Sequence, residues 1–211
     1  MHTITFISTV HERLGKCDSS ELFAILAEIK PDVIFLEALE STYSSYHQNT
    51  FTNFGVYHPK LEIAAIQKLS KKFPVKYVPV LKSVLPDSFL TKYKKLNEFN
   101  SLQRLFDDYN SNIEERGFAF LNSKECSDQN EKMREIERHL LNNNELEKLV
   151  NEGIDAYESS MMRNIYLYCR NNQFDTGVFM CGVAHRNSII DKMENYNTKE
   201  QLNLNWKIYG N

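Results

Sequence analysis

Two hydrophobic periodicities alternate along the first forty residues of the chain. Residues 3–10 (TITFISTV) alternate in polarity and are rich in β-branched side chains, which predicts a strand. Asp18 and Glu21 have the spacing of a capping box, and apolar side chains then recur at helical spacing up to Pro31. The continuous apolar run 32–39 (DVIFLEAL) has the length of a strand covered on both faces. Together these segments predict a βαβ unit.

A polar, tyrosine-rich segment at residues 41–58 has the composition of a loop or lid. Pro59 then stands where a proline opens a helix, and the apolar spacing predicts that this helix runs to about Lys72. Residues 75–80 (VKYVPV) are a third strand candidate. Pro79 lacks an amide donor, so it predicts an edge position for that strand or marks its end.

From residue 86 to 172 the spacing of apolar side chains is helical throughout and predicts four helices, the last beginning near Asn144. The apolar positions that define the first three are Leu90, Tyr93, Leu96 and Phe99, then Leu102, Leu105, Phe106 and Tyr109, then Met133, Ile136, Leu140 and Leu141. A strand pattern returns at residues 176–183 (TGVFMCGV). A short helix over 186–193 and a last strand pattern at 204–210 (LNWKIYG) follow it.

This order of elements predicts an α/β fold with a mostly parallel sheet and helices on both faces. A large all-helical insertion separates the third and fourth strands. We expect residues 1–211 to form a single α/β domain, with residues 86–172 as the insertion within it.

Charge and composition indicate which partners and which cellular location to expect. The 211 residues carry a net charge of −3, whereas proteins that bind nucleic acid usually carry a basic excess, so nucleic acid is not expected as a partner. No apolar stretch approaches the roughly 18 residues of a membrane-spanning helix, and no secretory signal is evident, so a membrane is not expected either. The expected location is the cytoplasm, where the four widely spaced cysteines should be reduced.

Several common active-site motifs are absent from the sequence. The chain has no GxxxxGK[ST], GxGxxG, GxSxG or HExxH. Their absence argues against a P-loop, a nicotinamide site, a standard α/β-hydrolase and a zincin-type zinc site. The lack of a C-x-x-C pair excludes a zinc ribbon.

Titratable side chains stand where three predicted strands end. His11 and Glu12 follow the first strand, and Glu37 lies near the end of the second. His185 follows the strand pattern at 176–183. Because ligands of open parallel sheets bind at the carboxyl ends of the strands, we expect these groups to meet at one edge. Two imidazoles and a carboxylate suit a divalent metal or a general base oriented by a carboxylate. Taken singly, each histidine is also compatible with a surface position, and Glu37 with a cap on the next element.

Two further charged residues lie in apolar surroundings. Glu62 sits in LEIAAI, on the helix after the tyrosine-rich segment, and Arg163 sits in MMRNIYLY, on the last helix of the insertion. A buried guanidinium needs a carboxylate or an anionic ligand. The alternatives are an arginine whose stem packs while its head reaches water, or an Arg–Glu pair that ties the insertion to the sheet.

The order of these motifs is distinctive. The first strand ends in Ser8-Thr9-Val10-His11, and the second contains Glu37; the later motifs are Glu62 before Ala-Ile, Arg163-Asn164, and Gly182-Val183-Ala184-His185. This series resembles the superfamily that joins TraB/PrgY pheromone-shutdown proteins, GumN-like proteins, Tiki metalloproteases, erythromycin esterases and ChaN-type haem-binding proteins. Its members carry two GxxH motifs, the first of which has serine in place of glycine here. The acidic residue usual after the third strand has no counterpart.

The resemblance implies an α/β core in which the two histidines and the glutamates face one pocket. Tiki-like members are metal-dependent proteases, erythromycin esterases open a lactone with a histidine base, and ChaN-like members bind haem. Fold alone therefore does not settle the function.

The first hypothesis is a hydrolase that cleaves a peptide, ester or amide bond. Its divalent metal ion would be held by His11, Glu37 and His185 and would activate a water. Glu12 or Glu62 would take the proton of that water, and Arg163 would hold a substrate carboxylate or the oxyanion. A metal-free variant uses either histidine as the base.

The alternative is a non-catalytic binding module for haem, a peptide or another small molecule. Residues 43–58 and the insertion would then supply apolar walls. An interaction scaffold is the third possibility.

Overall fold

The computed structural model describes residues 2–39, 60–85, 87–96 and 99–210. In this part of the chain, five strands form one sheet in which every neighbouring pair is parallel. The strands are β1 (Thr3–Thr9), β2 (Val33–Leu39), β3 (Lys76–Leu81), β4 (Thr176–Gly182) and β5 (Asn205–Ile208), in the spatial order β3-β2-β4-β1-β5. The predicted fold class is confirmed, and β3, which contains Pro79, lies at an edge.

The position of β4 determines which chain segments meet at the carboxyl edge. Although β1 and β2 are joined by one helix, β4 lies between them, with Thr9 beside Gly182 and Leu36 beside Met180. The ends of β1, β2 and β4 are therefore neighbours. This arrangement brings Glu37 and the two segments that end in a histidine, residues 8–11 and 182–185, to one place on the edge of the sheet.

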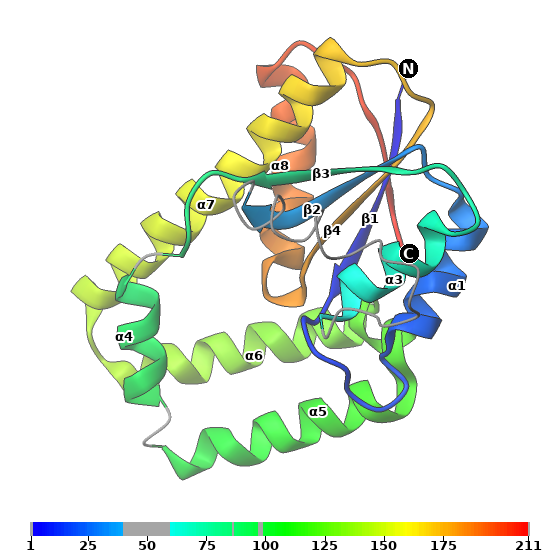
Figure 1. Cartoon of the computed structure of the whole chain (residues 1–211). Helices are drawn as coiled ribbons and strands as arrows, with labels where there is room; N and C mark the ends of the chain where they lie inside the picture. The colour runs from blue at the N-terminus through cyan, green and yellow to red at the C-terminus, as the bar shows by residue number, and fades with distance from the viewer. Residues whose placement is uncertain (1, 40–59, 86, 97–98, 211) are drawn as a thin grey trace.

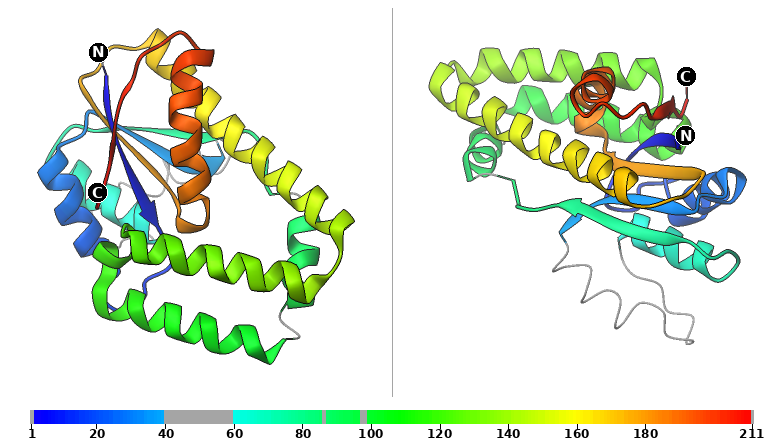
Figure 2. Two further views of the ribbon diagram at one scale, coloured as in Figure 1. Left: turned by 180° about the vertical axis from the view of Figure 1, so that it is seen from behind. Right: turned by 90° about the horizontal axis from the view of Figure 1, so that it is seen from above.

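Helices cover both faces of the sheet because alternate side chains of each strand point to opposite sides. On one face, α1 (Ser19–Ile29) and α3 (Leu61–Ser70) pack against Ile7, Ile34 and Met180. On the other face, α7 (Asn144–Asn171) and α8 (Arg186–Lys199) pack against Phe6, Phe35 and Phe179. Figure 2 shows the two layers on opposite sides of the strands.

The predicted helical insertion is present between β3 and β4. It consists of α4 (Asp87–Leu96), α5 (Asn100–Leu121), α6 (Lys124–Leu141) and α7. Figure 1 shows α4, α5 and α6 beyond one end of the sheet, with α7 running from that group back across it. No described helix combines the length and the apolar character that crossing a bilayer requires.

Asn122, at the end of α5, attaches the insertion to β1. Its side-chain oxygen accepts from the amide of Ser8 at 2.8 Å, and its side-chain nitrogen donates to the carbonyl of Ser8 at 3.1 Å. Asn122 is fully buried. The backbone N–H and C=O of Ser8 are thus both satisfied by one side chain of the insertion. This contact fixes α5 and α6 against the end of the sheet.

The local predictions are mostly confirmed, with two corrections. Asp18 caps α1, since it accepts from the amides of Ser20 and Glu21 at 2.7 and 2.9 Å. The capping-box role of Glu21 is wrong: its carboxylate accepts from the amide of Phe118, in α5, at 3.1 Å. The last helix, α8, continues to Lys199, six residues beyond the predicted end. Pro59 and the tyrosine-rich segment lie outside the described residues.

The four cysteines are free thiols, and all of them are buried: Cys17, Cys126, Cys169 and Cys181. For Cys181 in particular, burial raises the pKa of the thiol well above its usual value. These cysteines therefore act as small apolar side chains in the core.

Gly117 marks a kink in α5 whose backbone only glycine adopts easily. Its φ is 58° and its ψ is −140°, and a methyl group there would lie 2.2 Å from a carboxylate oxygen of Glu21. We expect Gly117→Ala to lower the free energy of unfolding by about 1–3 kcal/mol through backbone strain and this clash. Denaturant unfolding measures the change. The matched control is Gly153→Ala, inside α7, which should raise stability by roughly 0.5–1 kcal/mol. Equal effects of the two substitutions would contradict the prediction.

Candidate functional site

Three of the predicted site residues meet around Gly182, at the end of β4. A methyl group on Gly182 would lie 3.3 Å from Oε2 of Glu37 and 3.8 Å from both Nε2 of His11 and Cδ2 of His185. These residues come from segments about 25 to 170 positions apart in sequence and are brought together by the strand order. The expectation that they share one edge of the sheet is met by their positions.

Glu37 is a buried carboxylate whose two oxygens both accept hydrogen bonds. The amide of Gly182 donates to Oε2 at 2.6 Å, and the hydroxyl of Tyr157 donates to Oε1 at 2.7 Å. Nε2 of His185 lies 3.7 Å from Oε1. Because Glu37 lies inside β2, the alternative that it caps a following element does not hold. Burial and the charge of Glu37 both raise the pKa of Tyr157, so its hydroxyl stays protonated and remains a donor.

His11 and Glu62 form the first imidazole–carboxylate pair of the site. Nδ1 of His11 lies 3.0 Å from Oε1 of Glu62, which also accepts from the hydroxyl of Thr9 at 2.8 Å. The Glu62 side chain is 5% exposed and that of His11 is 53% exposed. The hydrogen bond to Glu62 raises the pKa of His11 above its ordinary value, against an opposing effect of burial. Glu62 therefore orients His11 and stabilises its charged form.

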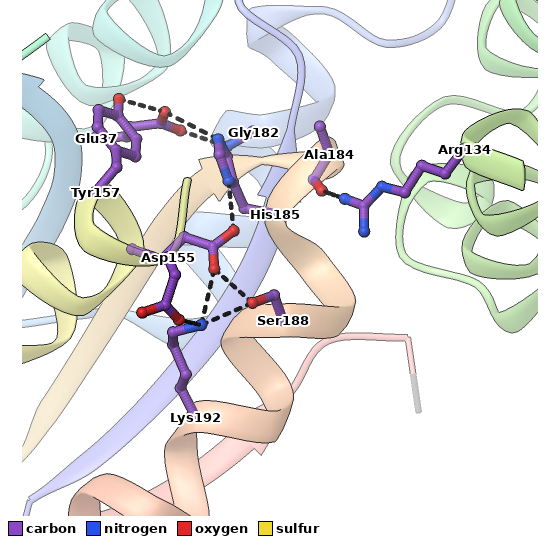
Figure 3. A network of polar contacts seen from close by, with 10 residues as sticks. Glu37, Arg134, Asp155, Tyr157, Gly182, Ala184, His185, Ser188 and Lys192 are labelled. Carbon is purple, nitrogen blue, oxygen red and sulfur yellow. Dashed lines mark hydrogen bonds and ion pairs between the residues drawn. The ribbon is translucent and has the colours of Figure 1, made fainter. Parts of the chain in front are cut away.

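His185 and Glu158 form the second pair, on the α7 side of the sheet edge. Nδ1 of His185 lies 2.7 Å from Oε1 of Glu158, and the ring stacks on Tyr157 with centroids 5.5 Å apart. Oε2 of Glu158 accepts from Lys192 at 3.0 Å and from the hydroxyl of Ser188. Figure 3 shows this network running from Glu37 through His185 to Lys192.

The charge of Glu158 is maintained although the side chain is buried. Burial by itself would raise the pKa of this carboxyl, but hydrogen bonds from His185, Ser188 and Lys192 hold it below its usual range. Sequence reasoning missed Glu158. A signal existed, because Glu158 lies four residues before Met162 and seven before Ile165 on the apolar face of α7. A carboxylate at such a position requires a partner.

A cavity of about 240 Å³ opens beside these groups. Its polar wall contains His11, Glu37, Glu62, Tyr157 and Lys60. The remaining wall is aliphatic: Leu36, Ala38, Leu39, Ile63, Leu81, Val84 and Leu85. His11 is thus the imidazole that faces the cavity, whereas His185, with a side chain only 8% exposed, lies behind Glu37 and Tyr157.

Two predicted site residues lie apart from this cluster. Glu12 is exposed in the segment after β1 and does not line the cavity. Arg163 is exposed on α7, which matches the alternative of an arginine whose head reaches water. The cation that lines the cavity is Lys60, a residue that sequence reasoning did not select. The roles assigned to Glu12 and Arg163 stay predictions without support from their positions.

The predicted metal ligands fit a divalent ion only in part. Each imidazole has its Nδ1 held by a glutamate, the arrangement that commonly orients metal-binding histidines. Both oxygens of Glu37, however, already accept short hydrogen bonds. Among the described residues, no group of three or more His, Cys, Asp or Glu side chains is arranged to hold a metal ion. Metal binding by this set stays a prediction.

Comparison of the chain with protein-family models, with curated proteins and with solved structures gave no match in any of the three. The resemblance to the TraB, Tiki and erythromycin esterase superfamily thus rests on the motifs themselves.

The Glu62–His11 pair leads to a pH-dependent prediction. We expect Glu62→Gln to lower the pKa of His11, because the variant loses the charge and the carboxylate hydrogen bond that raise it. A raised pKa in the folded state means that the pair stabilises the fold fully below about pH 6.5 and that this contribution is lost as the pH rises through the folded pKa. The variant should show a weaker form of this dependence.

NMR titration of His11 in both proteins measures the change directly, with the resonances of His139, exposed on α6, as the internal control. An unchanged His11 titration in a folded Glu62→Gln variant would show that the contact is too weak in solution to matter.

Proposed function

We propose that the protein is a hydrolase that cleaves a peptide, ester or amide bond at the cavity beside Gly182. One observation supports this most directly. Two imidazoles, each hydrogen-bonded at Nδ1 by a buried glutamate, lie close to Gly182 together with the buried carboxylate of Glu37. An imidazole oriented by a carboxylate is the usual form of a histidine general base.

In this proposal His11 is the base. Its Nε2 takes a proton from a water in the cavity as the oxygen of that water attacks the substrate carbonyl. Glu62 keeps Nδ1 protonated and stabilises the imidazolium that forms. When the tetrahedral intermediate collapses, the proton passes from Nε2 of His11 to the leaving oxygen or nitrogen.

The walls of the cavity suggest how a substrate is held. Lys60 is a cationic donor in the wall and suits the negative charge that develops on the carbonyl oxygen, whereas the single hydroxyl proton of Tyr157 is already donated to Glu37. The aliphatic wall favours a substrate with a compact apolar group next to the scissile bond.

The experiment is a hydrolysis screen with short peptides, esters of aliphatic acids and aryl amides. The wild type is compared with His11→Ala, His185→Ala and, as a matched control, His139→Ala, each after chelation and again with divalent ions restored. We expect His11→Ala to lower kcat/KM by at least about 100-fold and His139→Ala to leave it unchanged. Activity that returns only with a divalent ion would support the metal-assisted form. Wild-type activity in both His11→Ala and His185→Ala would rule the proposal out.

The binding module for haem, a peptide or another small molecule stays the second candidate. The observation that favours it is the aliphatic wall of the cavity, which can hold an apolar ligand without any chemical step. Haem titration followed by absorbance, together with a small-molecule screen by NMR, tests it. Saturable binding that His11→Ala abolishes, with no turnover of any substrate, would favour binding over hydrolysis.

A further inference from the structure

We propose that Glu158 is a positioning residue that holds a proton on Nδ1 of His185 and so fixes the orientation of the ring beside Glu37. The two distances are 2.7 Å, from Nδ1 to Oε1 of Glu158, and 3.7 Å, from Nε2 to Oε1 of Glu37. Glu158 is 0% exposed, so no bulk water competes for the contact. A buried carboxylate accepts and does not donate, and it therefore requires a proton on the nitrogen it faces.

The hydrogen bonds to the second oxygen of Glu158 support this assignment. Oε2 accepts from the ammonium of Lys192 at 3.0 Å and from the hydroxyl of Ser188. Lys192 in turn contacts Asp155 at 2.9 Å, and the Asp155 side chain is 68% exposed. The carboxylate is thus held in place by donors on α8, while its other oxygen is left for the imidazole.

This network also connects the candidate site with the insertion. Glu158, Asp155 and Ser188 line a second cavity, of about 450 Å³, with Lys92, Arg134 and Glu137. Arg134, on α6, donates to the carbonyl of Ala184, directly before His185. Two helices of the insertion therefore hold His185. Helix α7 contacts its Nδ1 through Glu158, and α6 contacts the carbonyl directly before it through Arg134.

The substitution Glu158→Gln makes the proposal testable because it replaces one hydrogen-bond acceptor, a carboxylate oxygen, by a hydrogen-bond donor, an amide NH₂. Lys192 and Ser188 both need an acceptor, so the single carbonyl oxygen of the glutamine should turn toward them. The amide nitrogen then faces Nδ1 of His185 and donates to it. We therefore expect the tautomer to invert, with the proton on Nε2.

The readout is the pair of ring-nitrogen shifts of His185 in long-range ¹H–¹⁵N NMR spectra. The wild type should show Nδ1 protonated, and Glu158→Gln should show Nδ1 unprotonated and Nε2 protonated. Glu158→Asp keeps the carboxylate and should retain the wild-type tautomer, and Glu152→Gln, exposed on the same helix, should change nothing. A wild-type His185 with its proton on Nε2 overturns the proposal without any variant. An unchanged tautomer in folded Glu158→Gln does so as well.

The effect on turnover rests on the proposed function and is measured separately. Hydrolysis that uses His185 as well as His11 predicts that Glu158→Gln lowers kcat by about 100-fold or more with little change in KM and that Glu158→Asp recovers part of the loss. Failure to find any substrate would remove the proposed hydrolase and leave the tautomer result standing. An inverted tautomer with unchanged kcat would show that His185 does not take part in the reaction.

Discussion

Replacement of Arg186 by methionine should lower the free energy of unfolding by about 3 kcal/mol, one of the two largest effects we expect. Arg186 opens α8 and is 3% exposed. Its guanidinium donates to the hydroxyl of Ser8 at 3.1 Å, to the side-chain and main-chain oxygens of Asn122 at 3.0 and 2.8 Å, and to the carbonyl of Tyr209 at 3.1 Å. One side chain thus joins β1, the end of α5 and the segment after β5.

Methionine fills similar space but donates nothing, so these four oxygens lose a buried donor. Burial also lowers the pKa of the guanidinium, and removing that charge from the interior returns part of the lost stability. We expect a fall in Tm of roughly 6–12 °C. Calorimetry of the variant measures it. The matched control is Arg163→Met, exposed on α7, which should change stability by less than about 0.5 kcal/mol. Similar melting temperatures for the two variants would show that the buried contacts of Arg186 contribute little.

A single methyl group on Gly182 should disable the site while every functional group remains. The φ and ψ of Gly182, −54° and 137°, are open to any residue, so Gly182→Ala carries no backbone strain. The added carbon lies 3.3 Å from Glu37 and 3.8 Å from the rings of His11 and His185, so the carboxylate has to move by a few tenths of an ångström. For a substrate identified by the screen, we expect kcat/KM to fall on the order of 100-fold, because small misplacements of catalytic groups have effects of this size.

Gly177→Ala is the control for this prediction, because it adds the same group to the amino end of the same strand. There the methyl group would lie 3.1 Å from the ring of Phe174, away from the site. We expect Gly177→Ala to lower Tm and to leave kcat/KM at the wild-type value, whereas Gly182→Ala lowers kcat/KM with little change in Tm. Equal activity in the two variants would argue that the reaction takes place elsewhere on the molecule.

The elements that sequence predicted well are those set by local periodicity. The four helices of the insertion and all five strands follow from apolar spacing within about ten to thirty residues, and the edge position of β3 follows from one proline. The meeting of His11, Glu37 and His185 could also be predicted, because the carboxyl ends of parallel strands lie at one edge of the sheet.

The partners of the site residues could not be predicted in the same way. Glu158 was missed although its position on an apolar face was visible, because nothing local shows which imidazole it meets. For Arg163 the sequence left open a buried guanidinium or one whose head reaches water; Arg163 is exposed, and Arg186, which was not considered, is buried. On a helix, a shift of a few residues moves a side chain from one face to the other, and apolar neighbours in sequence do not identify the buried face.

The sequence by itself determined the class of fold, the order of its elements and the residues that could supply chemistry at the sheet edge. It did so because hydrophobic periodicity and strand polarity act over short stretches of chain. Only the tertiary structure decided that β4 lies between β1 and β2, that Glu62 and Glu158 hold the two imidazoles, and that Arg186 joins the insertion to the sheet. These contacts link residues up to 178 positions apart. Which residues meet in these contacts depends on how the helices pack on the sheet, and no local sequence pattern encodes it.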